Sequence, residues 1–271
     1  MAHPAIFIQD STDPRIAPYL GVRERDLVGR DGLFMAEGEV VLRVLAQSPE
    51  VEPVSILVTE KRLAGLEDIL THLAPETPVY TADQSVMDQI VGFPIHRGIL
   101  AVGRRRRVPS ADAVLAGLGP KALIMVLCGI ANHDNMGGLF RNAAAFGVDA
   151  ILLDAESCDP LYRKAIRVSV GGTLVMPFAR LGSGDDLSDL LQRYGFASLA
   201  LSPSGETTLA DLPRPARAAI LLGAEGPGLS AQVLARSQTV RIPMAEGFDS
   251  LNVATTAAVV LHHLRFVASD V

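Results

Sequence analysis

Cysteine is scarce in this chain: only Cys128 and Cys158 occur among its 271 residues. Two cysteines cannot build a disulfide framework, and their separation does not match the ligand spacing of a zinc site. The histidines form no zinc pattern either, so we expect no bound metal. The amino-terminal residues lack the basic segment and apolar run of a signal peptide. A reducing compartment fits this composition best, and we expect a cytoplasmic protein.

Long apolar runs and an excess of positive charge are also missing. The longest apolar runs, such as Ala122–Cys128, are too short to cross a bilayer, so we expect no membrane association. The formal net charge is −6 and the pI is about 5.5, which argues against a histone-like, broadly polybasic binder but leaves room for a local basic groove. The aromatic share of 5% is low, whereas the hydrophobic share of 49% is ordinary for a globular protein.

Three familiar catalytic motifs are absent from the sequence. No G-x-G-x-x-G follows a strand pattern, and no G-x-x-x-x-G-K-[ST] occurs, which excludes a dinucleotide fingerprint and a P-loop. The G-x-S-x-G elbow of the α/β-hydrolases is missing as well. A generic α/β enzyme for small molecules is therefore disfavoured, because no other catalytic set stands in for these motifs.

The first hundred residues alternate between helix and strand patterns. Apolar residues recur at helical spacing in Gly38–Gln47 and Arg62–Leu73, whereas Val54–Thr59 and Gly98–Val102 are rich in β-forming residues. This alternation predicts a small three-layer α/β domain over residues 1–103.

Four consecutive arginines, Arg104, Arg105, Arg106 and Arg107, open a segment that is rich in alanine and glycine up to Pro120. We interpret residues 104–120 as the connection between two domains. The arginines are either a solvated part of that linker or a patch that contacts RNA phosphates, since each guanidinium can neutralise one phosphate.

Residues 121–271 alternate more regularly. Ala122–Ile130 reads as a strand covered on both faces, and Gly137–Phe146 as the helix after it. Further strands are expected at Thr173–Phe178 and Thr239–Met244, among about six with intervening helices. The prediction is an α/β fold with a mainly parallel sheet that has helices on both faces.

Two loops near the carboxyl terminus attract attention. Gly223–Gly228 follows the apolar run Ile220–Gly223, and a second loop precedes a long helix for which Ser250 is a suitable N-cap. Open α/β sheets bind their ligands in such loops at the carboxyl ends of strands. The last helix is apolar over more than one face, which predicts burial against a second copy of the chain as well as against the core.

Three segments together resemble the motifs of one family. Asn135-Met136-Gly137 with Arg141-Asn142-Ala143 and Phe146-Gly147 is similar to the first motif of the SpoU/TrmH-type RNA ribose 2′-O-methyltransferases of the SPOUT superfamily. The run from Leu222 to Ser230 resembles their second motif, and Ile242-Pro243-Met244 with Ser250-Leu251-Asn252-Val253 resembles the third. The chain departs from the family where Asp-Pro often precedes the motif asparagine: it has Asn132-His133.

The resemblance implies a deep trefoil knot formed by the carboxyl-terminal segment, S-adenosylmethionine as cofactor, and a homodimer. The first hundred residues more loosely resemble the L30e-like substrate-binding domain that often precedes this catalytic domain. The implied activity is methylation of a ribose 2′-hydroxyl, with ribosomal RNA as the expected target and transfer RNA as the alternative. A catalytically inactive RNA-binding protein is the competing hypothesis.

The resemblance also assigns roles to residues. It implies that Arg141 lies beside the target phosphate and hydroxyl, as a phosphate anchor or, more boldly, as the general base. Asn135 would orient Arg141 or the ribose, or serve only as a cap or Asx-turn at the helix start. Glu225 would organise Asn135 and the arginine, or only cap the following helix.

The remaining roles complete the expected site. Ser250 and Asn252 would contact substrate or catalytic groups, although Ser250 would also suffice as a plain N-cap. The cofactor would be framed largely by backbone groups, for which glycines permit close approach. The expected cofactor-binding residues are Leu201, Leu222, Gly223, Ala224, Gly226, Ile242, Pro243, Met244 and Leu251.

Overall fold

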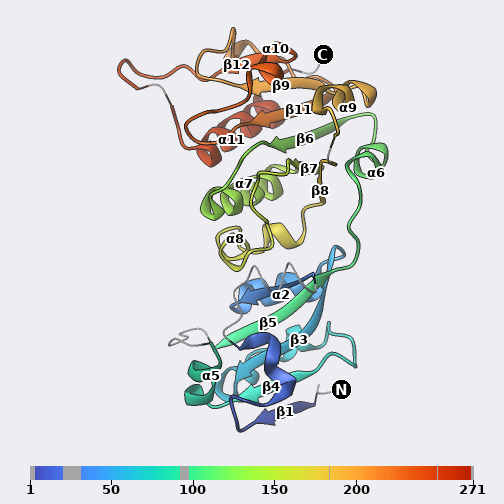
Figure 1. The fold of residues 1–271 in the computed structure, drawn as a ribbon, viewed down its shortest axis with the longest axis vertical. Helices are drawn as coiled ribbons and strands as arrows, with labels where there is room; N and C mark the ends of the chain where they lie inside the picture. Colours follow the sequence, from blue (N-terminus) through green and yellow to red (C-terminus); the bar gives the residue numbers. More distant parts are fainter. Residues whose placement is uncertain (1–3, 21–31, 92–97, 183, 249, 270–271) are drawn as a thin grey trace. The chain divides into compact units, whose positions relative to one another are not determined.

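The computed structural model describes residues 4–20, 32–91, 98–182, 184–248 and 250–269, and the chain divides into two compact units (Figure 1). The first unit comprises Met1–Arg107 and Leu161–Val175, and the second comprises Val108–Pro160 and Met176–Val271. Leu161–Val175 lies within the range expected for the second domain, but its contacts group it with the first unit.

The first unit contains a five-stranded mixed sheet. The spatial order is β1 (Ala5–Ile8), β4 (Val79–Ala82), β3 (Val51–Thr59), β5 (Ile99–Arg105) and β2 (Leu33–Glu37). Strands β1, β4 and β3 run parallel, whereas β5 is antiparallel to both of its neighbours, β3 and β2.

Helices cover both faces of this sheet. On one face the 3₁₀-helix η1 (Pro14–Tyr19) and α5 (Gln84–Val91) bury Ile16, Met87 and Ile90 against the strands. The helix α2 (Glu39–Gln47), predicted from its spacing, contacts β2, β3 and β5. The single helix expected over Arg62–Leu73 is wrong: two short helices, α3 (Glu60–Leu63) and α4 (Glu67–Leu70), flank Gly65, a residue that costs backbone entropy inside a helix.

Leu161–Val175 packs on the first unit through α8 (Arg163–Val168), which contacts β2, and the 3₁₀-helix η2 (Gly172–Leu174). The hydroxyl of Ser48 donates to the carbonyl of Leu174. The strand predicted over Thr173–Phe178 is therefore wrong, because the chain turns at Val170 and Gly171, both with positive φ, and the next strand starts only at Phe178.

The second unit contains a seven-stranded sheet in which every pair is parallel. An α/β fold with a mainly parallel sheet is thus confirmed. The spatial order is β10 (Thr207–Thr208), β12 (Gln238–Arg241), β9 (Ala197–Leu201), β11 (Arg217–Leu222), β6 (Ala122–Leu127), β7 (Ala150–Leu153) and β8 (Phe178–Arg180).

The two faces of the parallel sheet bury alternate residues of each strand, as the period of a β-strand requires. Ile124 and Val126 of β6 pack with α6 (Ala111–Ala116), α9 (Leu187–Arg193) and α10 (Ala231–Ala235). The alternating residues of β6 are equally buried and face α7 (His133–Phe146) and α11 (Val253–His262), which lie against each other (Figure 1). Residues 104–120 were expected to connect two domains, but they include α6, which buries Leu115 in the core of the second unit.

Two helix starts differ from the sequence prediction. Helix α7 begins at His133, four residues before the expected position, because the side chain of Asn132 accepts from the backbone N–H groups of Asp134 and Asn135. Helix α11 begins at Val253, and its N-cap is Asn252 rather than Ser250. In both cases an asparagine side chain satisfies N–H groups that the first helical turn leaves unpaired.

The carboxyl-terminal helix leaves part of its apolar surface uncovered. Helix α11 continues into the π-helical turn η4 (His263–Val267), on which Phe266 is 67% and Val267 62% exposed. The ring of Phe266 contacts those of Phe146 and His262. Among the described residues, no helix is long and apolar enough to cross a membrane.

Candidate active site

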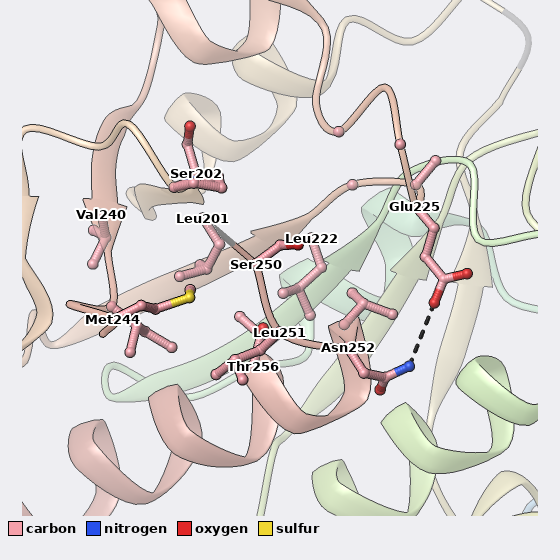
Figure 2. Close-up of a pocket in the computed structure, with 17 residues that line it drawn as sticks. Leu201, Ser202, Leu222, Glu225, Val240, Met244, Ser250, Leu251, Asn252 and Thr256 are labelled. Atoms are coloured by element: carbon pink, nitrogen blue, oxygen red, sulfur yellow. Dashed lines mark hydrogen bonds between the residues drawn. The ribbon is translucent and has the colours of Figure 1, made fainter. Parts of the chain in front are cut away.

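A cavity of about 640 Å³ opens at the carboxyl ends of β9, β11 and β12 (Figure 2). Its wall is completed by the loop after β12 and by the first turn of α11. In a parallel sheet all carboxyl ends share one edge, so loops from distant sequence positions meet there. The lining residues are Leu201, Ser202, Pro203, Leu222, Gly223, Ala224, Glu225, Gly226, Gly228, Val240, Ile242, Met244, Ser250, Leu251, Asn252, Val253 and Thr256.

The loop after β11 is a tight turn that only glycine permits at its start. A Cβ on Gly223 would lie 2.3 Å from the carbonyl carbon of Gly228, which is far inside van der Waals contact. The turn closes through the N–H of Gly228, which donates to the carbonyl of Ala224 at 3.0 Å. Ser230 then caps α10, so Glu225 is not the cap of that helix. The cavity wall here consists mostly of backbone.

Three polar side chains from three separate elements form one network beside the cavity. Asn135 of α7 donates to Oε1 of Glu225 at 2.6 Å. Asn252 donates to Oδ1 of Asn135 at 2.8 Å. It also donates to Oε1 of Glu225 at 3.4 Å, the bond that Figure 2 shows as a dashed line. Asn135 is buried, whereas Glu225 and Asn252 reach the surface beside the cavity.

The cap of α11 ties this network to the backbone. The side-chain oxygen of Asn252 accepts from the N–H groups of Ala254 at 2.9 Å and Thr255 at 3.3 Å, so its amide nitrogen faces Asn135. The alternative interpretation of Asn135 as the helix cap is wrong, since Asn132 caps α7 and Asn135 lies inside the helix. The departure from the family motif at Asn132 thus supplies the cap itself.

Arg141 is placed apart from this network. It lies on α7 six residues after Asn135, is exposed, and does not line the cavity. A separation of six residues on a helix rotates the side-chain direction by about 600°, so the side chains of Arg141 and Asn135 point about 120° apart around α7. Within this chain the structure brings together Asn135, Glu225 and Asn252, with Ser250 in the cavity wall, but not Arg141.

The expected cofactor-binding residues line the cavity with one exception, Pro243. Sequence reasoning missed Val240 and Thr256, among others. Val240 is placed by its register opposite Leu201 on β9, which no local pattern reveals. Thr256 stands one turn after Asn252 on α11, a spacing that would have indicated it once the cap was known.

The two cysteines are unsuited to nucleophilic catalysis. Burial, followed by the nearby charge of Asp154, raises the pKa of Cys128 to about 12. Burial and the charge of Asp159 raise the pKa of Cys158 to about 11. Both remain thiols at neutral pH, whereas the nucleophile is the thiolate. In the part of the chain that is described, no three His, Cys, Asp or Glu side chains gather as a metal site.

The arginine run belongs to the end of β5 in the first unit. Glu52 accepts from Arg104 Nε at 2.5 Å and from Arg106 Nη1 at 3.0 Å, and Arg106 also donates to the carbonyl of Val51. All these side chains are partly exposed, so the pairs contribute little to stability. Two of the four guanidinium groups are thereby held at fixed positions on the surface of the unit.

Comparison with known proteins gives matches over nearly the whole chain. Residues 122–262 match the model of the SpoU rRNA Methylase family. An uncharacterised tRNA/rRNA methyltransferase of Mycobacterium bovis is 39% identical over 264 residues, which cover 93% of this chain and 89% of the relative.

Solved structures of RNA methyltransferases are also similar to this chain over nearly its whole length. A structure described as an RNA 2′-O ribose methyltransferase has a TM-score of 0.75 and 26% identity, and covers 96% of this chain and 98% of its own. The AdoMet-bound rRNA methyltransferase from Sinorhizobium meliloti has a TM-score of 0.81 at 20% identity, with 96% and 97% covered. The latter likeness concerns the fold.

Proposed function

The chain belongs to the SpoU rRNA methylase family and is an RNA methyltransferase, and from this premise we propose that it methylates a ribose 2′-hydroxyl with S-adenosylmethionine as the methyl donor. The observation that carries the proposal is the cavity beside the Asn135–Glu225–Asn252 network, because it places a ligand pocket against polar groups from three elements. Ribosomal RNA is the preferred target, in line with the description of the family, and transfer RNA is the alternative.

The cavity suits the proposed methyl donor. At Gly223 the backbone of Gly228 leaves no space for a Cβ, so the cavity wall there is backbone, whose polar groups suit the polar edges of a nucleoside. Leu201, Ile242 and Met244 give the opposite wall apolar contacts, as small-molecule sites commonly do. When bound, the cofactor would supply a methyl group on a sulfonium, an electrophile that no protein side chain provides. The similar Sinorhizobium enzyme, whose structure contains AdoMet, supports this choice.

The chain's own residues position the acceptor. Asn135 and Asn252 hold Glu225 by hydrogen bonds, which fixes polar groups at the mouth of the cavity where a ribose would lie. Ser250 in the same wall is proposed to contact the ribose. Arg141 lies apart from this network within the chain; it is proposed as the anchor of an RNA phosphate, since a guanidinium stays protonated and pairs bidentately with phosphate. The bolder role, removal of the hydroxyl proton by Arg141, is the alternative.

A knotted chain is part of the proposal, and the path of the chain supports it. After β12, residues 242–248 and 250–252 return past the ends of β9 and β11, where Ile242, Met244 and Ser250 line the cavity with Leu201 and Leu222. Helix α11 then packs on α7, the helix that follows β6. The tail therefore crosses back over strands that precede it, which a trefoil knot requires and which most folds avoid.

We further propose a homodimer that covers the apolar surface around Phe266 and Val267. Three large apolar side chains of this region, Val259, Phe266 and Val267, are each at least 40% exposed. Contiguous exposed apolar surface commonly marks an interface. The first unit is proposed as an L30e-like RNA-binding domain in which the arginines at 104–107 contact phosphates, and the protein is proposed to act in the cytoplasm.

Incubation of the purified protein with radiolabelled S-adenosylmethionine and total RNA tests the activity. We expect label in nucleosides methylated at the 2′-oxygen after nuclease digestion, and mainly in ribosomal RNA. Label on a base would contradict the proposed acceptor, and label mainly in transfer RNA would favour the alternative target. No label together with tight RNA binding would favour an inactive RNA-binding protein, which the intact Asn135–Glu225–Asn252 network argues against.

A further inference from the structure

Helices α7 and α11 lie in close contact where Gly138 faces Ala254. A Cβ on Gly138 would lie 2.9 Å from the Cβ of Ala254, so only glycine allows this approach. Val260 and Leu261, further along α11, are also buried. Apolar contacts of this kind are non-directional, and by themselves they do not fix how far one helix slides along another.

A polar contact lies at the same crossing. Asn142 of α7 donates from Nδ2 to the carbonyl oxygen of Ala254 at 2.7 Å. Ala254 also donates its N–H to Oδ1 of Asn252 at 2.9 Å. The two backbone polar groups of Ala254 are thus bonded to two asparagines, one from each helix region.

These bonds close a ring. Starting from Asn142, the path runs through Ala254 to Asn252, whose amide donates to Asn135, and Asn135 lies on the same helix as Asn142. The two α7 residues are seven positions apart, which is about two turns or 10 Å along the axis. The ring therefore attaches α11 to α7 at two points and fixes the position of α11 along the axis of α7.

We propose that Asn142 is a positioning residue of the active site, acting through Ala254 and Asn252 to hold the amide of Asn252 against Asn135. The proposal rests on the methyltransferase function proposed above for the same site. A hydrogen bond tolerates only a few tenths of an ångström in donor–acceptor distance. A slide of α11 by a fraction of one residue's rise of about 1.5 Å would break the bond to Asn135 and shift Val253 and Thr256 in the cavity wall.

The substitution Asn142→Asp tests this role, because aspartate has nearly the same shape but offers a carboxylate oxygen where Asn142 has its donor. We expect kcat to fall by about ten- to hundredfold, as misplacement of reacting groups commonly costs, while KM for RNA changes less than about threefold. Asn142→Ser, which retains a donor, is expected to recover part of the loss that Asn142→Ala causes.

A matched control separates positioning from loss of stability. Val260→Ala removes buried apolar volume from α11 outside the ring, so it should lower Tm while leaving kcat close to wild type below the unfolding temperature. A wild-type kcat in Asn142→Asp would overturn the proposal. So would a kcat loss in Val260→Ala equal to that in Asn142→Asp.

A second readout is independent of turnover. The side-chain amide NMR signals of Asn135 and Asn252 should shift in Asn142→Asp and remain in place in Val260→Ala. If the wild-type protein transfers no methyl group to RNA, the proposed function fails, and the amide signals still report whether Asn142 fixes the network. Unchanged amide signals in Asn142→Asp would refute the positioning role in either case.

Discussion

The two sheets of this protein use their strands differently. In the first unit the mixed order places strand ends on both edges, and the charged side chains described there form exposed pairs such as those of Glu52 with Arg104 and Arg106. In the second unit all strands are parallel, so their carboxyl ends meet at one edge and the loops after β9, β11 and β12 enclose a cavity. The parallel unit concentrates polar groups at one point, whereas the mixed unit spreads them over a surface.

This difference matches the division of labour proposed above, with chemistry in the parallel unit and extended contacts with RNA on the mixed one. Substitutions in the parallel unit should therefore change turnover or cofactor binding by large factors. Substitutions in the mixed unit should change RNA affinity by small factors that depend on salt.

The largest expected effect belongs to Arg141→Ala. We expect turnover to fall below about a thousandth of wild type, because the acceptor loses its phosphate anchor or its base. Affinity for S-adenosylmethionine should remain nearly unchanged, since Arg141 does not line the cavity. Single-turnover kinetics and calorimetric titration measure the two quantities, and an equal loss of both would contradict the assigned role.

The next effect concerns cofactor binding. Gly223→Ala forces a methyl group into the backbone of Gly228, so the turn must open and S-adenosylmethionine affinity should fall by about a hundredfold or more. Gly195→Ala is the control: this glycine has positive φ, and it lies after α9 with nothing near the added Cβ. It should cost about 1 kcal/mol of stability and leave cofactor affinity intact. Comparable loss of affinity in both variants would show that the turn is not part of the cofactor site.

The two units should also respond differently to alkaline pH. The pKa of Cys128 in the folded state is about 12, against an ordinary value of 9.0. The folded state therefore holds the thiol proton more tightly than the unfolded state, which stabilises the fold while the thiol is protonated. This contribution is complete below pH 9 and is lost as pH rises from 9 towards 12, because only the unfolded chain releases the proton there. In the first unit, burial raises the pKa of Tyr19 well above its usual 10.0, so the corresponding loss begins one pH unit later.

Denaturant unfolding between pH 8 and 11 measures this dependence. The second unit should begin to lose stability near pH 9, and Cys128→Ala should make its pH profile flatter although the absolute stability falls. Tryptophan introduced separately into each unit would distinguish the two transitions, since the chain has none of its own. An identical slope in wild type and Cys128→Ala would contradict the assignment.

The smallest effect is expected in the first unit. Replacing both Arg104 and Arg106 with alanine should weaken RNA binding by about tenfold or less at low salt and reduce the salt dependence of binding. The value of kcat at saturating RNA should not change, because these residues lie at the end of β5. The variant Lys121→Ala outside the run serves as a charge control for the single variant Arg104→Ala, and equal effects of these two single variants would indicate that net charge alone matters.

Much of the fold could be predicted because apolar patterns report local structure well. The strand at Ala122–Leu127 is almost wholly apolar and buried, and α2 shows a plain helical spacing. Helix starts were harder, since Asn132 and Asn252 each compete with neighbouring residues that are equally suitable as caps. Only the tertiary bonds of Asn252 to Asn135 and Glu225 explain why it, and not Ser250, caps α11.

The residues of the site could be predicted more readily than their positions relative to one another. The glycine turn and the asparagines were found from the motifs, but Val240 enters the cavity through strand register, which a single sequence does not encode locally. The separation of Arg141 from the polar network depends on its angle around α7. The spatial order of the parallel strands could not be predicted from the apolar pattern either, because it depends on how the connecting helices pack on the sheet.

The return of residues 242–248 and 250–252 and of α11 to the cavity has a consequence for biosynthesis. The wall that contains Ser250, Asn252 and Thr256 is translated after every strand of the parallel sheet. The strands can therefore pair while the residues that complete the ligand pocket are still to be made. A nascent chain at that stage is expected to have its sheet and still be unable to bind the proposed methyl donor.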